Sequence, residues 1–251
     1  MRPAALVLSV FCTLAGCDGV ASEPRSAQPV AFPVRWTHHV ELKDLAEARA
    51  LDKYLDAPVV TVNGREKINM VEINGEGKTV ATTPREWLEL RGKRYAPRTT
   101  YDIKAESWFK SVVLPKLCLA CARPARVSHL RDFRLTDRPL QQLPLHLGLN
   151  LMEQSTWEER LARFERGETW GEICPTLRVE VEDEYAVVVA DDDEKNCIDL
   201  LAWADFDGDG IEDVLLSVTN YAIRGTFCAY RYVIVTRKTR GGRLLVIRRY
   251  S

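Results

Sequence analysis

The stretch that most constrains the fold is an acidic loop between two apolar runs, Ile198 to Ala204 and Val214 to Val218. Apolar runs of this length, bounded by Asp and Gly, predict two strands joined by a turn. Acidic side chains occupy alternate positions of the turn, so they converge on one point while the intervening residues face away. The spacing predicts a calcium site with these ligands: Asp205, Asp207, Asp209, the backbone carbonyl of Ile211, and Asp213.

Two further features of the loop favour a bound cation. Gly210 falls where a calcium loop must turn sharply, between the third carboxylate and the backbone carbonyl. Carboxylates this close to one another repel unless a cation lies between them. The alternative interpretation is an Asp/Gly-rich hairpin turn that binds no metal.

The loop resembles the Asp-x-Asp-x-Asp-Gly-x-x-Asp calcium segments of FG-GAP/VCBS-type repeats, dockerins and thrombospondin type 3 repeats. It differs from an EF-hand because Leu216 stands where a bidentate Glu belongs and because its flanks are typical of strands. The strand flanks favour the FG-GAP type of setting. That family builds propellers from many copies, whereas this chain has a single copy and no internal period, so a propeller is not implied.

The N-terminal residues, Met1 to Cys17, have the features of a secretion signal: a basic start at Arg2, an apolar run and small residues before a cysteine. Leu14-Ala15-Gly16-Cys17 resembles a bacterial lipobox. The resemblance implies cleavage before Cys17 and attachment of diacylglycerol to its sulfur, which anchors the protein to a membrane of the cell envelope. The alternative is an ordinary secretory signal.

The residues after Cys17 bear on which membrane carries the anchor and on what the protein binds. Asp18 resembles the inner-membrane retention signal of enterobacterial lipoproteins, so the inner membrane facing the periplasm is expected where that rule applies. Residues 17–34 are rich in Ser, Pro, Ala and Gln and predict a flexible tether. The formal net charge of -1 gives no reason to expect nucleic acid, so the expected partners are an envelope protein or a glycan.

Five cysteines remain beyond the lipobox: Cys118, Cys121, Cys174, Cys197 and Cys228. Export to an oxidising space makes disulfides the default expectation, with two bridges at most within one molecule. Cys197 and Cys228 lie on predicted strands too far apart for a bridge unless the strand order is altered.

Cys118 and Cys121 form the only Cys-x-x-Cys in the chain, and three interpretations compete for it. A thioredoxin-like redox site needs a long helix opening at the motif, which Pro124 prevents. Zinc needs a second Cys/His pair, which His129 alone does not supply. A structural disulfide is the interpretation we favour.

The pattern of apolar residues predicts an α+β fold in two regions. Residues 35–150 are expected to mix helices with a hairpin, and residues 151–251 to form a helix and an antiparallel sheet that carries the calcium loop. Residues 35–251 form one large domain or two small ones. The helices expected before residue 150 are Leu42 to Leu55, Arg85 to Leu90, and Ile103 to Leu114, the last interrupted or ended by Pro115.

The chain contains no catalytic motif that we recognise. It lacks Gly-x-Ser-x-Gly, His-Glu-x-x-His and a phosphate-binding glycine loop. The histidines are expected to be structural, and His38 and His39 to face opposite ways on an extended chain. The sequence therefore favours a calcium-stabilised binding or structural module of the envelope over the alternative, a thiol-redox or hydrolytic enzyme.

Overall fold

The structure, a computed structural model, describes residues 32–58, 64, 67–73, 75–135, 143, 147, 154–190, 194–223 and 228–250. The predicted signal peptide, the lipidation site at Cys17 and nearly all of the tether lie outside these residues. The sequence also predicts a strand at Val59 to Val62 and a hairpin turn at Asn63-Gly64, and residues 59–63 lie outside the described residues as well.

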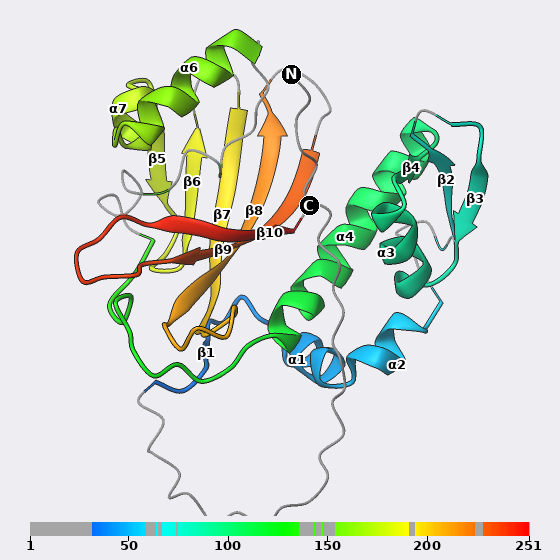
Figure 1. Cartoon of the computed structure of the whole chain (residues 1–251), viewed down its shortest axis with the longest axis horizontal. Coiled ribbons are helices and arrows are strands. Elements are labelled where there is room, and N and C mark those ends of the chain that lie inside the picture. The colour runs from blue at the N-terminus through cyan, green and yellow to red at the C-terminus, as the bar shows by residue number, and fades with distance from the viewer. Residues whose placement is uncertain are drawn as a thin grey trace, which may run out of the picture.

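A large antiparallel sheet forms the centre of the described chain (Figure 1). Its strands follow one another as a meander in the order β10-β9-β8-β7-β6-β5, and β1 pairs with β7 beside this path. The strands are β1 (Arg35–Trp36), β5 (Arg178–Val181), β6 (Ala186–Ala190), β7 (Glu194–Ala204), β8 (Asp213–Ala222), β9 (Cys228–Thr236) and β10 (Leu245–Tyr250). The antiparallel sheet expected in the C-terminal third is therefore confirmed, although β1 joins it from the N-terminal region.

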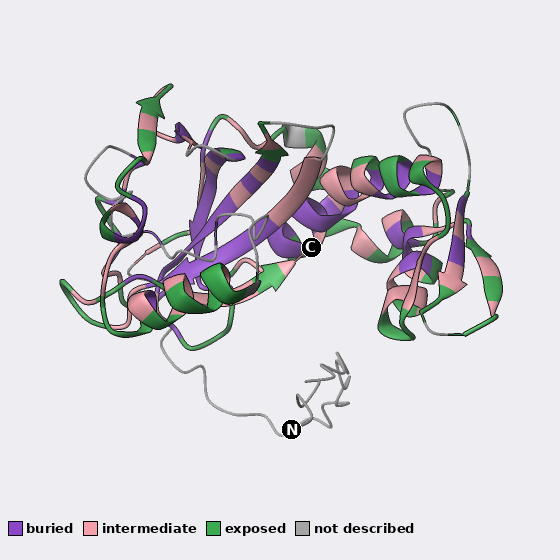
Figure 2. Cartoon of the chain, turned by 90° about the horizontal axis from the view of Figure 1, so that it is seen from above, coloured by how far each residue is buried: buried purple, intermediate pink, exposed green. Residues whose placement is uncertain are grey.

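The sheet is buried on both faces because alternate side chains enter two different cores. Val214, Leu216 and Val218 pack into a core with the helices α6 (Gln154–Glu165) and α7 (Trp170–Ile173). Leu215, between them, packs into a second core on the other face. In Figure 2 the central strands are accordingly mostly purple, while exposed residues gather on the outer sides of the helices.

The helix α4 (Thr100–Ala120) runs between the large sheet and a smaller three-stranded sheet (Figure 1). The small sheet has the order β3-β2-β4, and α1 and α2 lie at the lower end of α4. The elements of this part are α1 (Leu42–Arg49), α2 (Leu51–Leu55), β2 (Ile68–Glu72), β3 (Lys78–Ala81), α3 (Pro84–Gly92) and β4 (Tyr95–Pro97). Helices together with antiparallel sheets make the fold α+β, as predicted.

The helix α4 continues through Pro115, where the sequence predicts a break. Proline has no N–H, so the carbonyl of Ser111 loses its partner within the helix. The hydroxyl of Tyr232 on β9 donates a hydrogen bond to that carbonyl at 3.1 Å. Packing against the sheet thus compensates for the proline. The sequence predicts that Ile103, Trp108, Val112 and Val113 of this helix face inward. Val113 is completely buried, whereas Ile103 and Trp108 are exposed, so the prediction is wrong for these two residues.

A buried lysine joins α1 to α4. Lys116 is 2% exposed, and its ammonium contacts Asp44 at 2.9 Å and Glu47 at 3.1 Å. It also donates to the carbonyl of Val112 at 2.8 Å and lies 5.0 Å from the centre of the Tyr54 ring. A buried charge is tolerated only when it is paired and hydrogen-bonded in this way, and the pairing sets how α1 lies on α4.

Candidate metal centre

The acidic loop connects β7 to β8 at the end of the sheet where β1 pairs with β7 (Figure 1). The last pair of the β7–β8 ladder is Ala204 opposite Asp213, so residues 205–212 form the connection. Gly208 and Gly210 adopt φ of 86° and 85°, a region that side chains with a Cβ rarely occupy. The sharp turn predicted at Gly210 is therefore present.

Three of the predicted ligands lie together. Oxygens of Asp205, Asp207 and Asp209 are all within 4.8 Å of one another. Asp205 is 4% exposed, and its two oxygens accept hydrogen bonds from the amides of Gly208 at 2.6 Å and Gly210 at 2.9 Å. Such a group of carboxylate oxygens has the chemistry of a site for a hard cation.

Hydrogen bonds to the backbone hold the other two carboxylates of this group. Asp207 Oδ1 accepts from the amide of Asp209 at 3.1 Å, and Asp209 Oδ1 accepts from the amide of Ile211 at 2.7 Å. Each of these side chains therefore folds over the loop backbone toward the residue two positions further along. The regular spacing of aspartates seen in the sequence thus also builds the loop, because Asp side chains readily hydrogen-bond to backbone two residues on.

Asp213, the fourth predicted carboxylate ligand, lies at the base of the loop and is fully buried. Its Oδ2 accepts from the amide of Phe206 at 3.0 Å, whereas its Oδ1 has no hydrogen-bond partner among the described residues. Burial, together with the nearby Asp207 and Asp209, raises the pKa of this carboxyl to about 6, although Thr236 and the amide of Phe206 act to lower it. A buried anion with one unpaired oxygen is costly unless a cation lies close to it.

A lysine from outside the loop contacts the carboxylates. Lys238 Nζ forms ion pairs with Asp209 Oδ2 and, at 3.5 Å, with Asp207 Oδ2. Burial acts to raise the pKa of Asp209, but the hydrogen bonds from Lys238 and from the amide of Ile211 outweigh it and lower that pKa. A bound cation would compete with this ammonium for the same oxygens. Lys238 lies 29 residues from Asp209 in sequence, so the spacing of the aspartates did not point to it.

A segment directly after α4 holds the loop along its length, which the sequence did not predict. Residues 123–127 pair with the backbone at the beginning, at the turn and near the end of the loop. The bonds are Arg123 N to Asp205 O at 3.0 Å, Asp205 N to Arg123 O at 2.8 Å, Arg126 N and Val127 N to Gly210 O at 2.8 and 3.0 Å, and Glu212 N to Val127 O at 2.7 Å. The loop is therefore held before any ion binds.

Glu212, between Ile211 and Asp213, has a structural role that sequence spacing did not reveal. Its side chain is completely buried and accepts hydrogen bonds from Arg35 Nη2 at 3.1 and 3.2 Å. The hydroxyl of Ser128 donates to the same carboxylate at 2.5 Å. Arg35 also lies 4.5 Å from the centre of the Trp203 ring. Glu212 thus connects β1, the segment after α4 and the acidic loop.

The Cys-x-x-Cys pair lies at the C-terminal end of α4, where Cys121 follows the last helical residue. No disulfide joins any two of the described cysteines, which are Cys118, Cys121, Cys174, Cys197 and Cys228. Cys118 is completely buried, and burial raises the pKa of its thiol well above the ordinary value. A reactive redox cysteine requires the opposite, a lowered thiol pKa and access to solvent. The environment of Cys118 therefore does not favour a thiol-redox enzyme.

Comparison of the chain with protein-family models, with curated proteins and with solved structures gave no match. Among the described residues, no helix is both long enough and apolar enough to span a membrane.

Proposed function

We propose that this protein is a lipid-anchored module of a bacterial envelope, with a binding or structural role, whose sheet is stabilised by calcium in the β7–β8 loop. The observation that carries the proposal is the meeting of Asp205, Asp207 and Asp209 above the buried, incompletely paired Asp213. All of these donors are carboxylate oxygens, which suit calcium better than a soft transition metal.

The ion would act by fastening the corner between β7 and β8. Both strands are long and lie in the middle of the large sheet, so their connection contributes to the stability of both cores. Extracellular modules bind calcium with dissociation constants of about 10⁻⁴ to 10⁻³ M. At about 100 times the dissociation constant, binding to the folded state alone stabilises it by about 2.7 kcal/mol.

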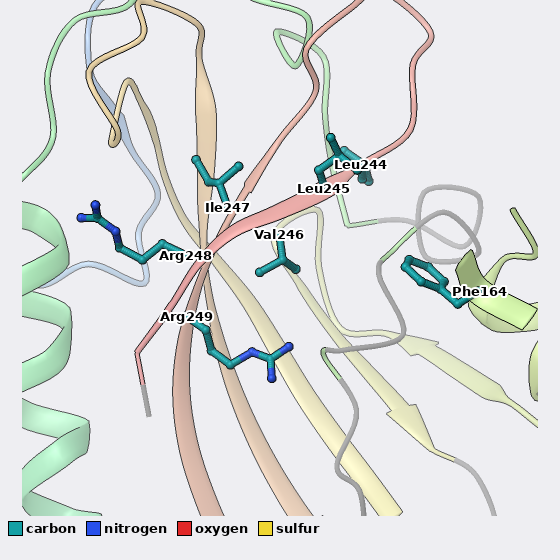
Figure 3. A pocket seen from close by; sticks show the side chains of 7 residues that line it. All are labelled: Phe164, Leu244, Leu245, Val246, Ile247, Arg248 and Arg249. Carbon is teal, nitrogen blue, oxygen red and sulfur yellow. The ribbon is translucent and has the colours of Figure 1, made fainter. Parts of the chain in front are cut away.

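An open pocket lies beside the edge strand β10. It has a volume of about 460 Å³ and is lined by Phe164 of α6 and by Leu244 to Arg249. Figure 3 shows Arg248 and Arg249 pointing to opposite sides of β10, with Val246 lying between the strand and Phe164. Pockets of several hundred Å³ accommodate small ligands or parts of larger ones.

The calcium proposal predicts a chelator-sensitive stability. The melting temperature of the wild type is expected to fall by roughly 5 to 10 °C when EGTA replaces saturating calcium. The reason is that losing about 2.7 kcal/mol of unfolding free energy shifts the melting temperature of a chain of this length by about that amount. Asp209→Ala is expected to remove this difference, since it deletes one of the three convergent carboxylates. Differential scanning calorimetry with and without calcium measures both.

Asp132→Ala is the matched control for this experiment, because Asp132 is exposed and lies outside the acidic loop. It is expected to keep the full response to EGTA, and magnesium is expected to replace calcium poorly, because magnesium sheds its water reluctantly. Equal melting temperatures of the wild type and Asp209→Ala, each unchanged by calcium, would refute the calcium site.

The lipid anchor has a separate test. Cys17→Ser is expected to move the protein from the membrane fraction to the soluble fraction of cells that process bacterial lipoproteins, and to abolish labelling by radioactive palmitate. The physical reason is that acyl chains on Cys17 supply the membrane affinity. Membrane retention and labelling that survive this substitution would remove the lipid anchor from the proposal while leaving the calcium site intact.

A further inference from the structure

Two adjacent histidines lie in a turn directly after β1. The hydroxyl of Thr37 donates to the carbonyl of Leu200 at 2.8 Å and accepts from the amide of His39 at 3.3 Å, and the amide of Val40 donates to the carbonyl of Thr37 at 3.3 Å. The chain is therefore not extended at this point. The prediction that His38 and His39 face opposite ways is wrong, because their ring centres lie 4.1 Å apart.

The two imidazoles converge on one carboxylate from the turn between β5 and β6. Asp183 Oδ2 lies 3.3 Å from Nε2 of His38 and 3.5 Å from Nε2 of His39. One donor atom of each of the three residues lies within 4.8 Å of the others. Atoms bound at about 2.0 to 2.1 Å to a tetrahedral zinc ion lie about 3.4 Å apart, so both separations match the edges of a zinc coordination tetrahedron.

We propose that His38, His39 and Asp183 form a second metal site, which binds a divalent transition-metal ion of the zinc class. Imidazole nitrogens are ligands that such ions prefer and that calcium does not, and a carboxylate oxygen binds such ions as well. Three protein ligands leave at least one position of a tetrahedron for water or a small ligand.

The carboxylate is held ready for this role by its own neighbours. Asp183 Oδ1 accepts a hydrogen bond from the amide of Tyr185 at 2.6 Å, which leaves Oδ2 directed at the histidines. The ring of His38 meets the edge of Tyr185 with 5.7 Å between ring centres. Partners behind the ligands of a metal commonly fix their orientation in this manner.

Simple ion pairing explains the arrangement less well than a shared metal. Two protonated histidines 4.1 Å apart would repel each other while sharing the single charge of Asp183. A divalent ion between neutral imidazoles removes that repulsion and uses all three donor atoms. His39 also lines a pocket of about 190 Å³ with Asp199, Ser217 and Tyr232.

The test measures zinc binding by untagged protein, since a polyhistidine tag would itself bind the ion. A chromophoric zinc chelator serves as competitor, with calcium at saturation so that the acidic loop is filled. The wild type is expected to bind one zinc ion per chain in competition with the chelator. His38→Ala and Asp183→Asn are each expected to lose at least about 10-fold in zinc affinity. Substitution of residues that only orient the metal ligands already costs about that much, so the loss of a ligand should cost no less.

The controls separate this site from the thiols and from the acidic loop. His129→Ala is the matched histidine control and is expected to bind zinc as the wild type does, because His129 lies outside the group of three ligands. His38 is 62% exposed, so its replacement is not expected to disturb folding, which circular dichroism checks. With cobalt(II) in place of zinc, the absorption spectrum should lack a thiolate charge-transfer band.

Three results would overturn the second metal site. They are wild-type zinc affinity in His38→Ala and Asp183→Asn, a thiolate band in the cobalt(II) spectrum, and loss of zinc binding in Asp209→Ala with retention in His38→Ala. The last result would place the zinc in the acidic loop instead.

Discussion

Replacing Glu212 by alanine is expected to lower the free energy of unfolding by about 3 kcal/mol. The substitution removes a fully buried carboxylate and leaves Arg35 and the hydroxyl of Ser128 without their partner. The side chain of Arg35 is 34% exposed, so water can solvate its charge once Glu212 is gone. The expected loss of unfolding free energy is therefore at the low end of the range for breaking a buried ion pair. Urea unfolding followed by circular dichroism measures it.

A double-mutant cycle separates the ion pair from the cavity that the alanine leaves. Arg35→Met keeps an apolar chain over Trp203 while removing the charge. The two single variants together are expected to lose more unfolding free energy than the double variant loses, because each single variant leaves the other charged group without its partner. Glu212→Gln preserves the volume and is expected to cost less than alanine. Additive effects, or a loss below about 1 kcal/mol in Glu212→Ala, would show that the pair does not hold the loop.

Asp213→Asn is expected to have opposite effects without and with calcium. Without calcium at neutral pH, it should stabilise the protein by an amount on the order of 2 kcal/mol, because the buried charge disappears. Asparagine retains an acceptor for the amide of Phe206, and its amide group faces Thr236, the residue opposite on β9. With saturating calcium, the variant should be less stable than the wild type, because one ligand is lost. Melting temperatures in EGTA and in calcium measure both effects.

The pH dependence of the wild type in EGTA follows from the same group. Asp213 has a folded-state pKa of about 6, above its ordinary value of 3.8, so the folded state holds this proton more tightly than the unfolded state does. Its contribution to stability is complete below the ordinary pKa and is lost as the pH rises through about 6. Asp213→Asn should abolish this part of the pH dependence. A variant that is destabilised equally in EGTA and in calcium would contradict this account of the buried carboxylate.

The features of this protein that depend on neighbouring residues could be predicted from its sequence. The strands flanking the acidic loop follow from the run and alternation of apolar residues, and the turn follows from Gly210. The meeting of Asp205, Asp207 and Asp209 follows from their spacing, since alternate residues of a tight loop converge. The helix expected at Arg85 to Leu90 is present as α3, which begins at Pro84 after the N-cap residue Thr83.

Helix α4 shows where a local rule fails. Pro115 predicts a break because it removes one backbone hydrogen bond, yet the helix continues because Tyr232, more than 100 residues away, bonds to the freed carbonyl. The faces of this helix were also misjudged at Ile103 and Trp108, because periodicity shows that apolar residues share a face but not which neighbours will cover them.

By itself, the sequence determined the α+β class, the two central strands and the three convergent aspartates, because each depends on residues within one turn or one strand. Only the tertiary structure brought Lys238 to the loop, buried Glu212 between Arg35 and Ser128, and carried His38 and His39 to Asp183. These contacts join residues from 29 to 177 positions apart, and their geometry depends on strand order and register, which a local pattern does not specify.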